Sequence, residues 1–547
     1  MTTYLWTIFR LFFKPVKGWV FLYLLLLNLV SNCVASYVFH GAWPLLQMVL
    51  LSFVSAYIEN AAYVLLAFKP LRRLYLGMMA LIHNILIVAD YFVVFSFQKI
   101  VNQDIVDILA ETNSAEIENF AGSYLQWPVI FVWVLGLTVL NFCLVKTSRR
   151  ISRMRYHLVA GICSAAGMLL CGHTMFSYLM YHNGNAVPQY HAFTRVAYAS
   201  YVMKQREGKI ELLGKVAREL EASAPEDAPN MVVIVGESYS VYHSSLYGYR
   251  QLTSPYLEHR RQNGELAVFD DVVSVADATH AVMQSVFSLD SLGIDFESKP
   301  LFPMCFKSAG YHTLMYDNQY FIGNGITFLS DEKLSGMMFD VRNGKRYGYD
   351  GDMVKDMENS PSPYLYVIHL WGQHYTYSER YPSEFSCFSA DDYDKTAWDA
   401  SQREVIAHYD NAMRYNDFVI NEIIKRFEND DCCIVYFADH GEEVYDYRNY
   451  MGHGNAHLTS QKQYQIRVPL MIWTSSSFRE KHPNLASQIQ SSAHAPVTTD
   501  DISHLILDIA GIKTECFSAS RSAINPNYNS EKPRIILHSL DYDKDCR

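Results

Sequence analysis

Three apolar segments in the second half of the chain each run into side chains that bind metal ions well. The segments and the residues that follow them are 231–235 with Glu237, 363–368 with His369 and His374, and 432–437 with Asp439 and His440. Short β-branched and aromatic segments between turn residues are typical of buried strands in a mostly parallel sheet. Ligands bind at the carboxyl ends of such strands, where Glu, Asp and His side chains can converge on one divalent cation. The pattern therefore predicts an α/β enzyme with a metal-dependent site.

A candidate nucleophile, Thr279, stands at the start of a segment whose pattern predicts a helix through Phe287. Backbone N–H groups and the helix dipole favour an anionic oxygen or a phosphate at that position. A threonine hydroxyl is a poor nucleophile at neutral pH, but a divalent cation beside it would make the alkoxide accessible. The neighbourhood of Thr279 alone is explained more simply by a helix N-cap, so both roles stay open at this point.

The first 181 residues contain five apolar segments, each near the ~20 residues needed to span a bilayer. They are 19–39, 43–68, 74–97, 126–145 and 157–181. Clusters of Lys and Arg lie before the first segment, between the second and third, and between the fourth and fifth. With five spans these clusters share one side, which the positive-inside rule makes cytoplasmic. The acidic stretch 98–125 is then expected to be an external amphipathic loop, and the residues after Tyr181 are expected outside the cytoplasm.

Ionisable side chains also fall within these apolar segments, at Glu59, His83 and Asp90. Charged groups in a bilayer are costly and often functional. Pairing across helices is the simpler explanation for them here.

The chain beyond the predicted membrane domain (1–181) divides into a helical connector and linker (182–229) and a larger domain (230–547). In the larger domain strand-like and helix-like segments alternate, which predicts helices on both faces of a sheet. The 547 residues carry a net charge of −11. Because binding to nucleic acid requires a basic face, the composition argues against a nucleic-acid partner.

Taken in order, the motifs resemble those of the bacterial phosphoethanolamine transferases, inner-membrane members of the alkaline phosphatase/sulfatase superfamily. The matching stretches are 236–238, 246–249 with 253–255, 316–319, 369–382, 409–411, and 439–442 followed by 453–454. The ordered set covers essentially the whole chain, and a five-span anchor is also that family's architecture. The ordered set is far more specific than a lone Asp-His-Gly would be.

The resemblance implies a fold and a set of site residues. The fold would be an α-helical membrane domain plus an α/β sulfatase-like soluble domain with a central, mostly parallel sheet. The implied zinc ligands are Glu237, Thr279, Asp439 and His440. Thr279 would also be the catalytic nucleophile that becomes phosphorylated. His374 and His453 would take part in catalysis by contacting the transferred phosphoryl group or a second metal.

The resemblance also implies substrates and a location. The implied substrate-binding residues are Thr112 and Glu116 in the external loop, Asn318, His374 and His453. The donor would be phosphatidylethanolamine, and the acceptor would be an envelope glycan or glycolipid such as lipid A or a core sugar. One tightly bound Zn²⁺ is expected, with a second Zn²⁺ and Mn²⁺ as open alternatives. The protein would span the bacterial inner membrane several times and hold its catalytic domain in the periplasm.

The chain departs from the family pattern in several places. The asparagine that the family tends to carry four residues before Thr112 is Ile108 here, and the family's small disulfide loop is replaced by residues 342–347. A glycerol-phosphate transferase of the lipoteichoic-acid synthase type and a membrane-anchored phosphodiesterase are the alternative functions. A sulfatase would need a cysteine or serine at the nucleophile, which Thr279 cannot supply. A purely binding role is disfavoured by the completeness of the site.

Overall fold

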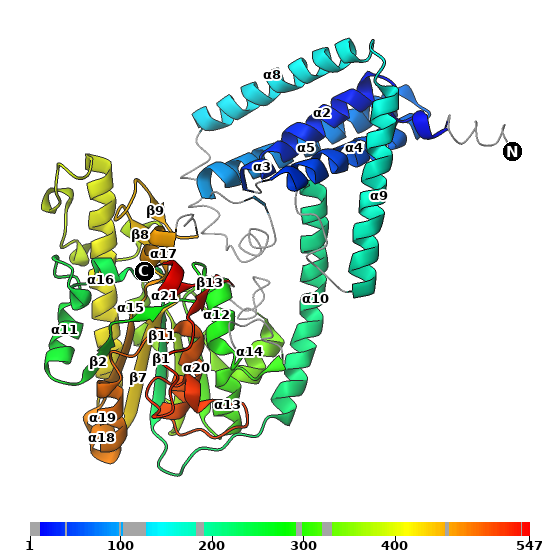
Figure 1. Ribbon diagram of the computed structural model, residues 1–547. Helices are drawn as coiled ribbons and strands as arrows, with labels where there is room; N and C mark the ends of the chain where they lie inside the picture. The colour runs from blue at the N-terminus through cyan, green and yellow to red at the C-terminus, as the bar shows by residue number, and fades with distance from the viewer. Residues whose placement is uncertain are drawn as a thin grey trace. The chain divides into compact units, whose positions relative to one another are not determined.

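The computed structural model describes residues 11–38, 41–97, 100–101, 127–181, 191–290, 298–319, 331–454, 459–537 and 539–546. The chain divides into two compact units, Met1–Arg206 and Glu207–Arg547. Figure 1 shows a unit of long helices and a unit in which helices surround a sheet. The division falls within helix α10, inside the predicted connector, and the predicted domain limits at 181 and 229 stay predictions.

The first unit is built from long apolar helices. They are α2 (Trp19–Cys33), α3 (Ala35–Val38), α4 (Ala42–Leu65), α5 (Lys69–Phe97), α8 (Trp127–Ile151), α9 (His157–Tyr181) and the start of α10 (Ala192–Glu219). Helix α2 packs against α4, α5 and α8, and α9 packs against α4. In the described part of the chain, α4, α5, α8 and α9 are long and apolar enough to cross a membrane, and α2 is shorter. The fifth span therefore stays a prediction. The predicted loop 98–125 lies outside the described residues except for residues 100–101.

Polar side chains inside this bundle pair with one another. Asn28 Nδ2 lies 3.1 Å from Glu59 Oε2, and His83 Nε2 lies 3.2 Å from Glu59 Oε1. Asp90 forms an ion pair with Arg195 at the start of α10. Because an unpaired charge among apolar helices is costly, these contacts explain how the bundle retains Glu59 and Asp90, and they agree with the expected pairing across helices.

A mostly parallel sheet forms the centre of the second unit. Among the described residues its strands lie in the order β2–β10–β7–β1–β6–β4–β5. The strands are β1 (Asn230–Gly236), β2 (Leu266–Phe269), β4 (His312–Asp317), β5 (Val341–Arg342), β6 (Tyr364–His369), β7 (Cys432–Ala438) and β10 (Leu470–Thr474). Strands β7, β1, β6, β4 and β5 are parallel, whereas β10 runs antiparallel to β7 and β2. Every residue of β1, β6 and β7 is buried, as expected for strands covered on both faces. The predicted fold class is confirmed.

Helices cover both faces of this sheet, with α11 and α16 on one side and α12, α13 and α20 on the other (Figure 1). Their bounds are α11 (Pro255–Gln262), α12 (Thr279–Phe287), α13 (Phe302–Ser308), α14 (Glu332–Met338), α15 (Asp350–Asp356), α16 (Ala400–Phe427), α17 (Thr459–Ile466), α18 (Ser476–Lys481), α19 (Pro483–Ser491), α20 (Ile502–Ile509) and α21 (Tyr542–Asp545). Short strand pairs are β3 (Val272–Val273) with β11 (Val497–Thr498), β8 (Glu443–Val444) with β9 (Met451–Gly452), and β12 (Ile535–Ile536) with β13 (Leu540–Asp541). The long helix α16 begins at a capping box formed by Asp399 and Gln402, which satisfies backbone N–H groups at its first turn.

The register of the parallel strands brings their polar ends together. Gly236 of β1 pairs with Ala438 of β7, so the next residues, Glu237 and Asp439, leave the sheet side by side. His369 ends β6 on the other side of β1. The carboxyl edge of the sheet therefore gathers these side chains at one place, as the three apolar segments predicted.

A buried histidine links the loop after β1 to helix α16. His243 Nδ1 lies 2.6 Å from Asp410 Oδ1, and His243 Nε2 lies 3.3 Å from Asp446 Oδ1. Burial opposes protonation, but Asp446 and Asp410 on the two sides of the ring raise the pKa of His243 to about 10. This pKa lies above the ordinary histidine value of about 6.5. The stability that the charged ring contributes is therefore fully present below about pH 6.5. It is lost as the pH rises through about 10.

We expect His243→Gln to lower the free energy of unfolding by about 3–5 kcal/mol near neutral and lower pH, because it leaves the buried Asp410 and the partly buried Asp446 without their cation. The difference from the wild-type protein should shrink as the pH rises toward 10. Thermal unfolding of the purified protein over this pH range measures both effects. His494→Gln is the matched control, since that exposed histidine pairs with Asp270 at the surface and should matter little. A difference that does not vary with pH would contradict a charged His243.

Candidate active site

Three fully buried side chains meet at the carboxyl edge of the sheet. Glu237 follows β1, and Asp439 and His440 follow β7. One ligand atom from each lies within 4.8 Å of the others, and all three residues have 0 % exposure to solvent. Two carboxylates and one imidazole are a donor set that suits zinc, so the structure brings together three of the predicted ligands.

Hydrogen bonds leave the metal-binding atoms of this cluster facing inward. His440 Nδ1 donates to the carbonyl of Gly441 at 3.0 Å, so His440 Nε2 is the ring nitrogen that faces the cluster. Asp439 Oδ1 accepts from the backbone of His440 at 2.7 Å. Asp439 Oδ2 is buried and lies 3.2 Å from His440 Nε2. A buried carboxylate oxygen this close to a ring nitrogen of a histidine fits two ligands of one bound cation.

The electrostatics of the cluster also call for positive charge. Burial opposes a charge on any of the three groups, yet His440 lowers the pKa of Glu237 well below its usual range. Burial and the neighbouring Glu237 raise the pKa of Asp439 to about 7. Against its own burial, His440 has its pKa raised to about 10 by Asp439 and Glu237. Two carboxylates this close can both remain ionised only beside a cation.

Thr279 is placed beside the cluster by the start of helix α12. Its Oγ1 lies 3.3 Å from Glu237 Oε2, which accepts the hydroxyl hydrogen, and 3.4 Å from His440 Nε2. The N-cap of α12 is Ala278, so the Thr279 hydroxyl serves the cluster and does not cap the helix. The hydroxyl is thus the fourth group at the point where the other three converge.

The loop that carries Glu237 is held by the backbone of Ser238 and by helix α16. Ser238 has a positive φ of 54°, a conformation that costs energy for a side chain other than glycine. In this conformation its N–H donates to Asp439 Oδ1 at 3.2 Å and its hydroxyl donates to Glu237 Oε1 at 2.7 Å. Tyr409 of α16 donates to the Ser238 carbonyl at 2.6 Å. The tyrosine of the 409–411 motif therefore positions a predicted metal ligand, a role that the motif alone did not indicate.

A second group of possible ligands adjoins the first. His440, Glu442 and His453 each offer one ligand atom within 4.8 Å of the others. The ring centroids of His440 and His453 are 3.9 Å apart. His453 Nδ1 lies 2.7 Å from Glu442 Oε2, and Tyr377 donates to Glu442 Oε1 at 2.5 Å. Glu442 thus orients His453 toward the cluster.

The other predicted site residues differ in what the structure says of them. Burial lowers the pKa of His374 to about 4. Glu237 acts to raise this pKa and Arg380 acts to lower it, so this histidine is neutral at neutral pH. Asn318 is buried and donates to Asp350 Oδ1 at 2.9 Å. Thr112 and Glu116 lie outside the described residues. The substrate-binding roles of all these residues stay predictions.

A mostly parallel sheet with two carboxylates and an imidazole at its carboxyl edge, beside a hydroxyl at a helix start, defines an α/β domain of the sulfatase type. The chain belongs to the sulfatase family, whose model, named Sulfatase, matches residues 229–512. The resemblance drawn from the motifs is thereby confirmed for the catalytic fold.

Curated and solved relatives agree with this assignment. The chain is 29 % identical over 340 residues to phosphoethanolamine transferase EptC of Escherichia coli, covering 57 % of each protein. It therefore matches little more than half of that relative's length. The C-terminal periplasmic domain of Escherichia coli EptC shares 26 % identity and covers 60 % of this chain and 96 % of that one, with a TM-score of 0.54 alone and 0.52 in its complex with Zn. The membrane protein EptA of Neisseria meningitidis covers 92 % of this chain and 97 % of its own at 18 % identity and a TM-score of 0.59, which indicates a shared fold.

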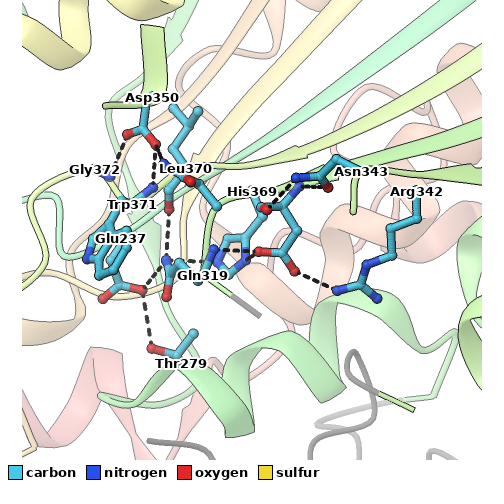
Figure 2. A network of polar contacts seen from close by, with 12 residues as sticks. Glu237, Thr279, Gln319, Arg342, Asn343, Asp350, His369, Leu370, Trp371 and Gly372 are labelled. Atoms are coloured by element: carbon cyan, nitrogen blue, oxygen red, sulfur yellow. Dashed lines mark hydrogen bonds and ion pairs between the residues drawn. The ribbon is translucent and has the colours of Figure 1, made fainter. Parts of the chain in front are cut away.

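Gly372 packs against the backbone of Glu237 and restricts what can stand there. Its φ is +50°, and a Cβ added to it would lie 2.9 Å from the Glu237 carbonyl oxygen. Asp350 holds this loop in place by accepting from the N–H groups of Trp371 at 2.9 Å and Gly372 at 3.0 Å (Figure 2). A side chain at position 372 can therefore be accommodated only by shifting Glu237.

We expect Gly372→Ala to reduce both zinc retention and catalytic activity at least about tenfold, because the strained backbone alone costs on the order of 1–3 kcal/mol. Zinc per protein chain, measured by elemental mass spectrometry after loading and desalting, provides the readout. Gly344→Ala is the control, since a Cβ at Gly344 meets nothing within 4 Å. Equal zinc content in the two variants would show that Gly372 does not position Glu237.

Proposed function

We propose that this protein transfers phosphoethanolamine from phosphatidylethanolamine to an envelope glycan or glycolipid, such as lipid A or a core sugar. The observation that carries the proposal is the Thr279 hydroxyl, which lies 3.3 Å from Glu237 Oε2 beside three buried metal-binding side chains. The names of the curated relatives support phosphoethanolamine as the transferred group. A threonine in this position supports a covalent phosphothreonine-type intermediate.

The residues that would hold the metal are Glu237, Asp439, His440 and Thr279. Zinc is the metal favoured by their donor atoms and by the zinc complex of the related periplasmic domain. A zinc ion bound there would act as a Lewis acid that favours ionisation of a hydroxyl and stabilises charge on a phosphoryl group. The adjoining group of His440, Glu442 and His453 supports a second cation, and Mn²⁺ remains the alternative metal.

In the first half of the reaction Thr279 Oγ1 would attack the phosphorus of the donor. The hydroxyl hydrogen faces Glu237 Oε2, which accepts it. As the Thr279 O–P bond forms, the bond between phosphorus and the diacylglycerol oxygen breaks, and diacylglycerol leaves with a proton. The product on the enzyme is phosphoethanolamine esterified to Thr279.

In the second half an acceptor hydroxyl or phosphate would attack the same phosphorus and release Thr279. His453 is suited to take the proton of an acceptor hydroxyl, because a hydrogen bond from its Nδ1 to Glu442 leaves its Nε2 as the acceptor atom. His374, which is neutral at neutral pH because burial lowers its pKa, can bind the phosphoryl group or assist this proton transfer. Two sequential displacements of this kind predict ping-pong kinetics.

We also infer that the protein spans the bacterial inner membrane five times and holds the second unit in the periplasm. The four membrane-length helices and the shorter α2 support the five spans, and the basic clusters between spans support the orientation. A membrane anchor keeps a lipid donor at high local concentration. Thr112 and Glu116 of the 98–125 loop, together with Asn318, are the proposed contacts to substrate.

Replacing the nucleophile tests the covalent mechanism. Thr279→Ala should abolish transfer while the protein retains zinc, because Glu237, Asp439 and His440 remain as ligands and water can complete the site. Asp439→Ala should lose both zinc and activity. Incubation of the wild-type protein with phosphatidylethanolamine should add one phosphoethanolamine mass to the peptide that contains Thr279.

The same experiment separates the alternatives. A glycerol-phosphate adduct on Thr279 would replace the proposed headgroup with that of a lipoteichoic-acid-type transferase. Release of free phosphoethanolamine without any acceptor product would indicate a phosphodiesterase. Near-normal transfer by Thr279→Ala would refute the covalent mechanism altogether.

A further inference from the structure

A chain of buried hydrogen bonds leads away from Glu237 to a residue outside the predicted site. Gln319, at the end of β4, donates through Nε2 to Glu237 Oε2 at 3.1 Å. The same amide lies 3.1 Å from His369 Nε2, and His369 Nδ1 lies 3.1 Å from Asp317 Oδ1. Arg342 completes the chain by donating to Asp317 Oδ2 at 3.0 Å. Figure 2 shows Gln319 between Glu237 and His369, with Arg342 at the far end.

The neighbours of Gln319 determine which way its amide points. Its nitrogen lies 2.7 Å from the Leu370 carbonyl oxygen as well as 3.1 Å from Glu237 Oε2. Two oxygens that only accept hydrogen bonds require the NH₂ group, and not the amide oxygen, at this position. The two amide hydrogens are shared among three neighbours, because His369 Nε2 also lies 3.1 Å from this nitrogen. On the other side of the ring, His369 Nδ1 donates to Asp317 Oδ1.

Every member of the chain is removed from water. Glu237 and His369 have 0 % exposure, Asp317 has 1 % and Gln319 has 4 %. The side chain of Arg342 is 5 % exposed. Buried polar groups are retained when each has a partner, and here Arg342 balances the charge of Asp317. The chain is thus a fixed polar support within an apolar core, and its free end meets Glu237.

The support reaches the Glu237 oxygen that faces the nucleophile. Glu237 Oε2 accepts from both Gln319 and the Thr279 hydroxyl, whereas Glu237 Oε1 accepts from Ser238 Oγ at 2.7 Å. The two oxygens are therefore held from opposite sides, one by the adjacent serine and one by Gln319. Without Gln319 the carboxylate could turn about its terminal bond, since such sp²–sp³ torsions are soft.

We propose that Gln319 is a positioning residue that fixes the Glu237 carboxylate for metal binding and for contact with Thr279, with His369, Asp317 and Arg342 holding Gln319 in turn. The inference rests on the proposed function for its metal, but it does not depend on which headgroup is transferred. Partners of metal ligands in other proteins affect metal affinity or activity by about 10–100-fold. Gln319 stands in that relation to Glu237.

Gln319→Leu tests this proposal, because leucine keeps the volume of the side chain and removes its amide. We expect the zinc affinity of the full-length protein, measured by competition with a chromogenic chelator, to fall about 10–100-fold. With phosphatidylethanolamine in mixed micelles, kcat should fall while KM for this lipid changes less than about twofold, since Gln319 is only 4 % exposed. Gln465→Leu is the matched control. That glutamine is also buried and also donates to a carboxylate, at 3.3 Å from Glu443 Oε2, but it has no contact with Glu237.

A second variant keeps the test decisive if Gln319→Leu fails to fold. Gln319→Asn retains a polar amide and shortens the side chain by one methylene, which withdraws the amide from Glu237. It should weaken zinc binding in the same direction while the melting temperature of the zinc-free protein changes little. Wild-type zinc affinity in a folded Gln319 variant would overturn the proposal, as would an equal loss in Gln465→Leu. A wrong headgroup in the transfer assay, with the zinc result as expected, would count only against the proposed function.

Discussion

Glu237 and Asp439 are two carboxylates without exposure to solvent, and they lie beside His440 at the end of the central sheet. One ligand atom of each of the three residues lies within 4.8 Å of the others. Charges of one sign in a buried place repel strongly, because little water remains to screen them. The raised pKa values of Asp439 and His440 likewise show that this position favours positive charge. A divalent cation would supply that positive charge with fixed geometry. It would also favour ionisation of the Thr279 hydroxyl that lies beside it. Thr279 acquires its proposed role from that neighbour, since an isolated threonine is a weak nucleophile.

The rest of the second unit serves to bring these groups together and to keep them in place. Parallel pairing of β1 with β7 sets Glu237 beside Asp439, and α12 begins where Thr279 can reach both. The loops themselves are braced by polar residues from distant elements. Tyr409 of α16 binds the Ser238 carbonyl, and Gln319 of the β4 end binds the Glu237 side chain. Repulsion within the cluster is thus resisted by a scaffold of hydrogen bonds from several directions.

Much of this arrangement could be predicted from the sequence, and the reason is physical. Runs of apolar β-branched residues indicate buried strands, and parallel strands end at one edge, so Glu237, Asp439 and His440 could be expected to meet. The orientation of Gln319 could not be expected, because it depends on two acceptors, Glu237 and the Leu370 carbonyl, that approach it from other strands. The motif that contains Gln319 marked the segment without assigning the residue a role.

Thr279 illustrates the same limit, because local sequence is compatible with both a helix cap and a nucleophile. The structure resolves the local question: Ala278 is the N-cap, and the Thr279 hydroxyl faces Glu237. Asn318 was predicted to bind substrate, and its side chain donates to Asp350 and accepts from the backbone of Tyr347 at 2.8 Å. Those contacts come from Asp350 at the start of α15 and from the backbone of Tyr347 just before it, and no pattern around Asn318 indicates them. Its predicted role, like those of Thr112 and Glu116, stays a prediction.

The central claim is that one divalent cation is bound where the buried carboxylates, the imidazole and the threonine hydroxyl converge. Anomalous diffraction at the zinc edge from crystals of the zinc-loaded protein tests it most directly. The expected result is a zinc peak about 2.0–2.2 Å from a carboxylate oxygen of Glu237, a carboxylate oxygen of Asp439 and His440 Nε2, with Thr279 Oγ1 as the fourth ligand. The claim would be contradicted by a zinc-loaded structure in which the peak lies elsewhere and Glu237, Asp439 and His440 form only hydrogen bonds with one another.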